Sequence, residues 1–150
     1  MEPRRAPTAD VRLGISTRSV MVLLAIGVVA IFAMARYLEP EPLGYGTHRQ
    51  LGLPPCHFLW VTGRPCPSCG MTTSFAWFVR GRFDRSFRAN PAGLFLAGCS
   101  LILIPWLLAG ATLGRTLGFR SLERPLIGLV AVTIALSLVS WTIRLTFQYP

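Results

Sequence analysis

The sequence contains no lysine and few charged residues of any kind. Its 150 residues include fifteen arginines and six acidic residues, so only 14% are charged, whereas 52% are apolar. Soluble globular proteins usually carry about 25% charged residues. The shortage of charge therefore excludes an ordinary water-soluble domain and favours a protein embedded in a lipid bilayer.

The excess of arginine gives a formal net charge of +9, which is also common among nucleic-acid-binding proteins. The arginines, however, flank apolar segments, as Arg18 and Arg36 flank the first one. In such places they meet lipid headgroups and set the orientation of the chain in the membrane. We therefore expect the lipid bilayer, and no nucleic acid, as the partner of these charges.

Patterns typical of β-structure and of repeat proteins are also missing. No segment alternates apolar and polar residues in the way that predicts a strand, and no internal repeat or low-complexity tract is evident. This excludes the βαβ context of thioredoxin-like motifs. The sequence predicts an all-α integral membrane protein that forms a single membrane domain over residues 1–150.

Three apolar segments predict transmembrane helices over residues 19–38, 91–113 and 125–144. The hydrocarbon core of a bilayer is about 30 Å thick and a helix rises about 1.5 Å per residue, so about twenty residues cross it. Asn90 and Pro91 are suited to begin the second segment as an N-cap and a first helical residue.

The first apolar segment also has features of a signal peptide. Arginines precede it, and Ala33-Met34-Ala35 fits a cleavage site. A transmembrane helix is the preferred interpretation, because the apolar run is longer than most signal-peptide cores.

The connecting segments differ in composition. Residues 1–18 form a basic N-terminal tail and residues 114–124 a basic loop. Residues 39–70 are rich in proline, glycine and cysteine, and their opening part predicts an extended loop. Residues 71–80 predict a short helix at the membrane edge or re-entering the membrane, and residues 82–89 an amphipathic helix at the interface.

Three cysteines fall in or beside the predicted loop. Cys66 and Cys69 form a CxxC motif, and Cys56 precedes it by ten positions, so we expect the three thiols to converge. CxxC spacing lets two sulfurs face one concavity, and a helix N-terminus just behind Cys69 stabilises a thiolate. The fourth cysteine, Cys99, lies within an apolar segment and is expected to be a small buried apolar side chain.

The cysteine pattern is compatible with three kinds of role. The first is a structural loop, either packed or closed by a disulfide from Cys56 to Cys66 or Cys69. The second is a metal site, with zinc as the candidate ion, in which His57 or His48 joins the three cysteines as the fourth ligand. The third is thiol–disulfide exchange, in which Cys66 attacks, Cys69 resolves and Cys56 passes electrons.

Thr72, Thr73 and Ser74 form a cluster of hydroxyl groups after the CxxC motif, and the neighbouring base is His57. A hydroxyl without an activating base is a weak nucleophile. We therefore expect these residues to cap the short helix, and the sequence predicts no catalytic residue.

The residues around the cysteines resemble a family of small bacterial membrane proteins, the domain of unknown function 2752. The resemblance rests on Cys56-His57-Phe58, Thr62-Gly63, the run PCPSCGMTT from Pro65 to Thr73, Gly81 and Asn90-Pro91. Many relatives in this family have an arginine after the first threonine of the run, where this sequence has Thr73. The resemblance implies a membrane location and a shared cysteine loop, and it implies no particular reaction.

The preferred interpretation is a non-enzymatic membrane protein whose three-cysteine loop has a structural role or binds a partner, namely another membrane protein. The alternative is a membrane thiol–disulfide oxidoreductase or a metal-binding accessory protein that uses Cys66 and Cys69. Arginines before the first span, and Glu39 and Glu41 after it, predict a cytoplasmic N-terminus in the cell (inner) membrane and a non-cytoplasmic cysteine loop. An oxidising outer compartment would favour a disulfide, and a reducing cytoplasm a bound metal.

Overall fold

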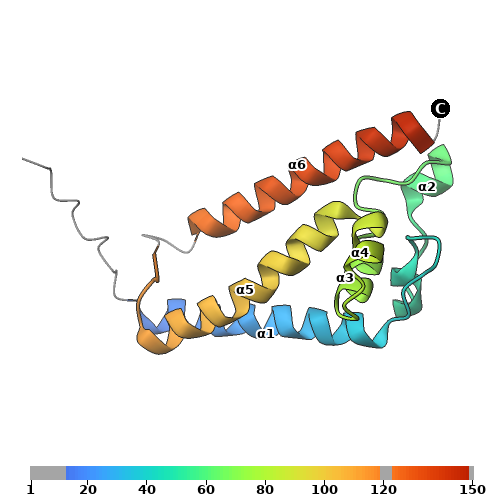
Figure 1. Cartoon of the computed structure of the whole chain (residues 1–150). Helices are drawn as coiled ribbons and strands as arrows, with labels where there is room; N and C mark the ends of the chain where they lie inside the picture. Colours follow the sequence, from blue (N-terminus) through green and yellow to red (C-terminus); the bar gives the residue numbers. More distant parts are fainter. Residues whose placement is uncertain (1–12, 119–122, 149–150) are drawn as a thin grey trace, which may run out of the picture.

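The computed structural model describes residues 13–118 and 123–148, and the secondary-structure elements in these residues are all helices (Figure 1). In chain order they are α1 (Ile15–Tyr37), η1 (Thr47–Leu51), α2 (His57–Thr62), α3 (Met71–Phe78), α4 (Phe83–Ala89), α5 (Pro91–Leu113) and α6 (Glu123–Gln148). The predicted all-α fold class is confirmed. Most of the predicted N-terminal tail lies outside the described residues.

Three of these helices, α1, α5 and α6, have the length and composition of membrane spans. Their mean hydropathy reaches 2.3, 2.1 and 2.3. The 23 residues of α1 or α5 extend about 34 Å, enough to cross the hydrocarbon core. Most of their side chains point away from the protein, as lipid-facing side chains do. The chain therefore has the architecture of an integral membrane protein with three candidate transmembrane helices.

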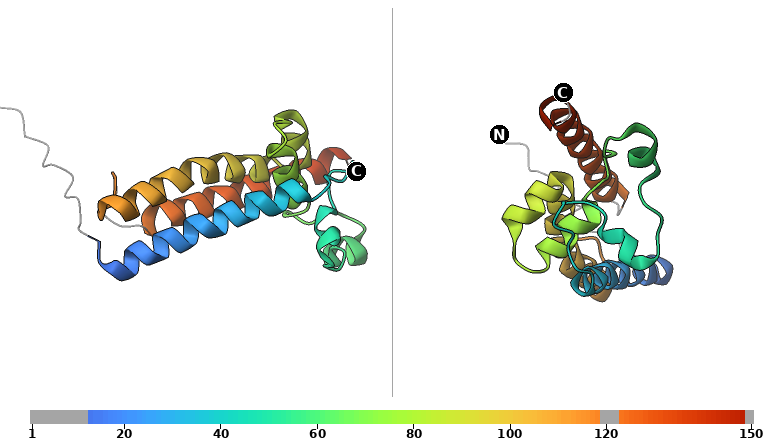
Figure 2. Two further views of the ribbon diagram at one scale, coloured as in Figure 1. Left: turned by 90° about the horizontal axis from the view of Figure 1, so that it is seen from below. Right: turned by 90° about the vertical axis from the view of Figure 1, so that its right-hand side faces the viewer.

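Helices α1 and α5 pack side by side through a close contact between Met21 and Gly110 (Figures 1 and 2). Met21 is fully buried, and a Cβ atom on residue 110 would collide with its Cε atom. Arg18 donates from Nε to the Ala111 carbonyl, 2.6 Å away, and from Nη2 to the Thr112 carbonyl, 3.2 Å away. These bonds satisfy carbonyls that the end of α5 leaves unpaired, and they fix its end to the start of α1.

Helix α6 packs on α5, and at the level of the backbone it makes no contact with α1 in the described parts of the two helices (Figure 1). Its outward side chains, such as Ile127 and Ile134, are more than half exposed. The last turns of α6 reach the end of the bundle where α1 ends and α5 begins (Figure 2).

Helices α3 and α4 pack against each other and against the start of α5 at this same end of the bundle. The Ser86 hydroxyl donates to the Ser74 carbonyl over 2.8 Å, and the Ser74 hydroxyl donates to the Asn90 carbonyl over 3.0 Å. All three residues are fully buried. A satisfied buried polar network of this kind fixes the relative positions of the helices that make it.

The prediction that Thr72, Thr73 and Ser74 cap α3 is wrong. The N-cap of α3 is Gly70, and no side chain caps this helix. The hydroxyl groups of Thr73 and Thr47 instead lie 2.8 Å apart, fully buried, and join α3 to η1. Their role is to hold neighbouring segments together rather than to begin the helix.

Arg80 lies just after α3 and caps the end of α1. Its guanidinium donates to the carbonyls of Ala35, Arg36 and Leu38 over 3.2, 3.0 and 2.8 Å. It also donates to the Ala76 carbonyl of α3 over 2.7 Å. A cation at a helix C-terminus is favourable both for these unpaired carbonyls and for the helix dipole.

The loop rich in proline, glycine and cysteine contains two short helices that the sequence did not predict, η1 and α2. They lie on the opposite side of the bundle end from α4 (Figure 2). Helix α2 makes no contact with another helix among the described residues at the level of its backbone, and Trp60 is 78% exposed. The ring of Phe58 lies edge-on to that of Trp141, with centroids 6.1 Å apart.

Candidate three-cysteine site

Cys66 and Cys69 face each other across one tight turn. The Cys69 N–H donates to the Cys66 carbonyl over 3.0 Å, which closes the turn. The Cys66 N–H points at the Cys69 sulfur, 3.3 Å away, and the two sulfur atoms are 3.1 Å apart. A backbone N–H that donates to a sulfur favours the charged thiolate. The turn therefore brings the two sulfur atoms into direct contact.

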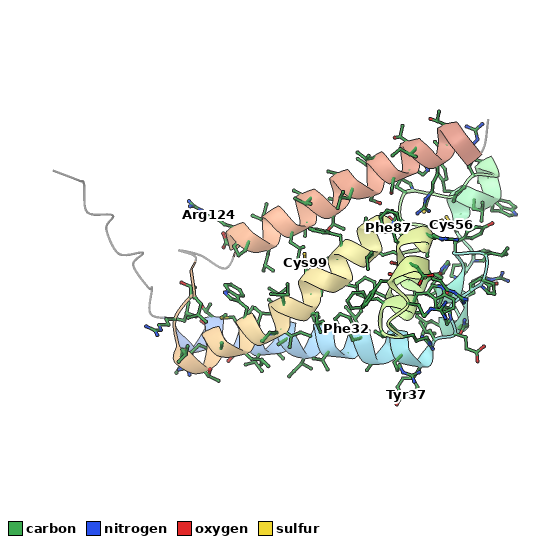
Figure 3. The ribbon with its side chains drawn as sticks, in the orientation of Figure 1. Phe32, Tyr37, Cys56, Phe87, Cys99 and Arg124 are labelled. Carbon is green, nitrogen blue, oxygen red and sulfur yellow. The ribbon has the colours of Figure 1, made fainter. Side chains whose placement is uncertain are left out.

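Cys56 approaches the same turn from a different segment of the chain. It stands immediately before α2, ten residues upstream of Cys66, and Figure 3 shows it at the end of the bundle that carries the short helices. The sulfur atoms of Cys56, Cys66 and Cys69 all lie within 4.8 Å of one another. The structure thus brings together the three thiols that the sequence predicted to converge.

Two side chains of α6 hold the CxxC turn in place. The Ser137 hydroxyl donates to the Pro67 carbonyl over 2.8 Å, and the Trp141 indole N–H donates to the Pro65 carbonyl over 2.7 Å. Four positions separate these residues, so they lie on one face of α6. The last predicted span is therefore a direct support of the cysteine site.

The N-terminus of α5 also supports the CxxC turn, through Asn90. Asn90 is the N-cap of α5, as predicted: its Oδ1 accepts from the Gly93 N–H over 3.1 Å. Its Nδ2 donates to the Cys69 carbonyl over 3.1 Å, and Asn90 is fully buried. A single amide therefore joins the helix terminus to the cysteine turn.

Gly70 closes the turn at a point where the backbone is crowded. Its φ of +89° is a conformation that other residues rarely adopt. A Cβ atom on this residue would lie 2.6 Å from the Gly44 carbonyl oxygen and would also collide with the Ala89 carbonyl oxygen. Only glycine fits here, because three backbone segments meet at this position.

The three cysteines line one open cleft of about 810 Å³. Helix η1 and the chain before it form the facing wall, with the polar side chains of Glu41, Tyr45 and His48. The cleft is thus large enough for a small ligand or for a side chain of another protein.

The three thiols do not share one electrostatic environment. Burial raises the pKa of Cys56, but hydrogen bonds from the Leu59 backbone and from the thiols of Cys69 and Cys66 outweigh it, so its pKa lies below the ordinary value. Burial, followed by hydrogen bonds to the thiols of Cys66 and Cys56, raises the pKa of Cys69 well above the ordinary value. Cys69 is only 7% exposed, whereas Cys56 is half-buried. A larger fraction of Cys56 than of Cys69 is therefore present as the thiolate at neutral pH.

The other predicted ligands and Cys99 lie in different places. His57 faces Trp60, with ring centroids 5.9 Å apart, and is not among the clustered ligand atoms in the described chain. His48 lines the cleft, and its Nε2 lies 3.2 Å from the Pro54 carbonyl oxygen. Cys99 is half-buried in the middle of α5, well away from Cys56 (Figure 3).

Ser137 and Trp141 are site residues that the sequence analysis did not assign to the cysteine loop. Their hydroxyl and indole groups stand four positions apart in a predominantly apolar helix. Polar groups on one face of a membrane helix require partners inside the protein. That spacing was the available signal, but the sequence does not say which backbone segment accepts the bonds.

These features define a class: an integral membrane protein with a three-cysteine cluster beside an open cleft at one end of its helices. Residues 56–104 match the model of the family described as Protein of unknown function (DUF2752). The match runs from Cys56 through α3 and α4 into α5, and it confirms the resemblance predicted from the cysteine motif. Comparisons with curated proteins and with solved structures gave no match.

Proposed function

We propose that this membrane protein binds a thiophilic metal ion, such as Zn²⁺, through Cys56, Cys66 and Cys69. The observation that supports the proposal is the convergence of three sulfur atoms, from two separate chain segments, within 4.8 Å of one another. Thiolate ligands select soft or borderline ions such as Zn²⁺ and Cu⁺. A disulfide uses two sulfurs, whereas a metal site uses all three.

The spacing of the sulfur atoms suits such an ion. Zinc–sulfur bonds of about 2.3 Å at tetrahedral angles place two sulfur atoms about 3.8 Å apart. In the structure the Cys66–Cys69 distance is 3.1 Å, and no pair within the cluster exceeds 4.8 Å. Side-chain rotations that change each separation by about 1 Å or less are therefore sufficient to form the site.

The surroundings support binding without a large rearrangement. Bonds from Ser137, Trp141 and Asn90 hold the backbone of the turn. Supporting interactions around metal ligands commonly change metal affinity by about tenfold to a hundredfold. The site is therefore pre-organised by parts of α5 and α6 that do not touch the ion.

The fourth coordination position would face the open cleft, because all three cysteines line it. His48, which lines the same cleft, or a ligand from outside completes a tetrahedral set. We propose that another membrane protein uses this open position to deliver or receive the ion. An accessible fourth position distinguishes such a transfer site from a closed structural zinc site.

Thiol–disulfide exchange is the second candidate, and the 3.1 Å distance between the Cys66 and Cys69 sulfurs favours it. In this reaction the two thiols lose two protons and two electrons and form a sulfur–sulfur bond. A disulfide in a partner membrane protein is reduced to two thiols in the same exchange. The thiol with the lowered pKa is Cys56, whereas the sequence predicts Cys66 as the attacking thiol.

The proposed orientation has a cytoplasmic N-terminus, with the cysteine cleft on the outer side of the cell (inner) membrane. Arg18 at the start of α1 and Arg124 at the start of α6 lie at the end of the bundle opposite Cys56 (Figures 1 and 3). Arginine-rich flanks favour the cytoplasmic side. The outer compartment is oxidising, so metal binding there competes with formation of a Cys66–Cys69 disulfide.

Cobalt binding tests the metal proposal. The full chain, purified in detergent and reduced, should bind about one Co²⁺ and show the thiolate-to-cobalt absorption of a tetrahedral site. Cys56→Ser, Cys66→Ser and Cys69→Ser should each weaken binding by more than about tenfold. Cys99→Ser is the matched control and should bind as the wild type does, because Cys99 lies outside the cluster.

Failure of the reduced wild type to bind Co²⁺, or equal binding by the cluster variants, would contradict the metal proposal. Protein purified without reductant tests the second candidate. A Cys66–Cys69 disulfide that exchanges rapidly with an added dithiol, together with no metal binding after reduction, would replace the first proposal by the second.

A further inference from the structure

We infer that a second site, on the face of α4, binds the phosphate group of an anionic phospholipid. The site is a separate pocket of about 390 Å³, lined by Arg85 and Arg88 of α4, by Trp77 of α3 and by Pro40, Pro42, Leu43 and Gly44. It shares neither a cysteine nor a polar side chain with the cysteine cleft.

The two arginines are placed to act on one ligand. They stand three positions apart on α4, so their side chains project from the same face of the helix. Both are exposed and both line the pocket. A guanidinium is a planar group with parallel N–H donors, which bind phosphate oxygens in pairs. Two such groups beside one pocket match the charge and the geometry of a phosphodiester.

The ring of Trp77 restrains the guanidinium group of Arg85 before any ligand binds. The central carbon of the Arg85 guanidinium lies 4.7 Å from the centroid of the Trp77 ring. This cation–π contact restricts the side chain while its edge donors can still reach a ligand. A ligand that binds Arg85 therefore loses less side-chain freedom than it would with a mobile arginine.

The local charge has no carboxylate to balance it within the pocket. Among the described residues that line the pocket, none is acidic. Asp84 on α4 lies 3.7 Å from Arg82 in an exposed pair, and Glu41 lines the cysteine cleft instead. Arg80 uses its guanidinium on the end of α1. An anion from outside the chain is therefore the complementary partner for Arg85 and Arg88.

The surroundings point to a lipid rather than a soluble anion. Phe83 and Phe87 of α4 are 54% and 57% exposed, and Tyr37 at the end of α1 is 87% exposed. Figure 3 shows Tyr37 pointing outward from that end of α1. Exposed aromatic rings beside arginines at the end of membrane spans are typical of the headgroup region. Phe83 and Phe87 stand four positions apart on a different face of α4 from Arg85, so they place the helix at the apolar boundary while the arginines face the phosphate layer.

Such a lipid also accounts for an unusual charge distribution. The end of the bundle that carries α4 has Arg85 and Arg88 of α4, the arginines between α3 and α4, and those of the neighbouring helix ends, yet the proposed orientation places it outside. Arginines on the outer side oppose the usual charge asymmetry of membrane proteins. A bound phosphate neutralises part of this charge where it concentrates.

Native mass spectrometry of the full chain in detergent tests the inference, with phosphatidylglycerol and phosphatidylcholine as probes. The wild type should retain phosphatidylglycerol in clear preference to phosphatidylcholine. A charge-assisted hydrogen bond from an arginine to a bound phosphate contributes about a tenfold gain in binding, so Arg85→Gln/Arg88→Gln should weaken phosphatidylglycerol binding by more than about twentyfold. Arg82→Gln, at the N-cap of the same helix but outside the pocket, is the matched control and should change it by less than about twofold.

Three results would overturn the inference. The first is a wild type with no preference for phosphatidylglycerol, a measurement that needs no variant. The second is an Arg82→Gln effect equal to that of the double variant, which indicates diffuse attraction instead of a site. The third is displacement of the lipid by inorganic phosphate at equal concentration, which indicates a soluble phosphate ligand. Circular dichroism on each variant confirms that it is folded.

Discussion

Trp141 and Pro65, 76 positions apart in the chain, are joined by a hydrogen bond of 2.7 Å from the indole N–H to the proline carbonyl. A backbone carbonyl inside a protein needs a donor, and for Pro65 a side chain supplies it. That donor comes from α6, the last of the three candidate spans. The position of α6 in the membrane and the shape of the cysteine turn are therefore mechanically linked.

Removing this hydrogen bond should loosen the cysteine turn. Trp141→Phe keeps an aromatic ring but leaves the Pro65 carbonyl without its donor, at a cost of about 1 kcal/mol in unfolding free energy. We expect faster alkylation of Cys66 and Cys69 in the variant, measured by mass spectrometry. Trp106→Phe is the control, because it removes an indole bond to the Leu117 carbonyl at the opposite end of α5. Equal acceleration in both variants would show that the effect is general destabilisation.

Gly70 should be essential for the site. Gly70→Ala adds a strained φ and a collision with the Gly44 and Ala89 carbonyls, so the backbone has to move, at a cost above about 3 kcal/mol. Gly81 also has a positive φ, of +70°, but a Cβ atom there meets nothing within 4 Å. Gly81→Ala should therefore cost only about 1 kcal/mol. Thermal unfolding in detergent compares the two, and a similar loss in both would refute the crowding at Gly70.

The sequence predicted the large features of the fold because each depends on local composition. Long uncharged runs predict spans, and Asn90 followed by Pro91 predicts the start of α5, which the structure places at that point. Convergence of the three cysteines followed from their spacing and from the prolines around them. Each of these features can be predicted because it depends on a few residues that are close in the sequence.

The supports of the site could not be predicted in the same way. Trp141 resembles an ordinary interfacial tryptophan, and Arg80 an ordinary flanking arginine, until the fold places backbone carbonyls beside them. Helix α2 has six residues, too few for a periodic pattern to appear. Its residues are mostly apolar, but Trp60 is exposed, so apolar composition alone does not predict how this helix packs.

Arg80 should be among the most important residues for stability outside the site. Arg80→Gln removes a charged donor shared by the carbonyls at the end of α1 and by Ala76, and it should lower the unfolding free energy by about 2 kcal/mol. Arg82→Gln is the control, because Arg82 is half exposed and pairs only loosely with Asp84. Thermal unfolding in detergent measures both, and equal melting temperatures for the two variants would contradict the capping role.

The reactivity of the thiols should separate with pH. The thiolate is the reactive form of a cysteine. The lowered pKa of Cys56 keeps it reactive at pH values where an ordinary thiol is protonated, and the raised pKa of Cys69 keeps it protonated at pH values where an ordinary thiol is ionised. In reduced, metal-free protein, alkylation of Cys56 should therefore reach half its maximal rate at a lower pH than a fully exposed cysteine. Cys69 should do so at a higher pH. Peptide mapping after timed alkylation measures each site, and the reverse order would contradict these environments.

Sidedness of the cleft decides whether a disulfide competes with the metal. A membrane-impermeant thiol reagent, applied to intact spheroplasts after an impermeant phosphine and chelator, should label Cys66 or Cys69, because both belong to the cleft that we place outside. The control is Ser16→Cys in a chain without the native cysteines: Ser16 is exposed at the opposite end of α1 and should react only after permeabilisation. The opposite pattern, in which Ser16→Cys is labelled in intact cells and the cleft only after permeabilisation, would reverse the topology. The cleft would then lie in the reducing cytoplasm, where free thiols favour metal binding over a disulfide.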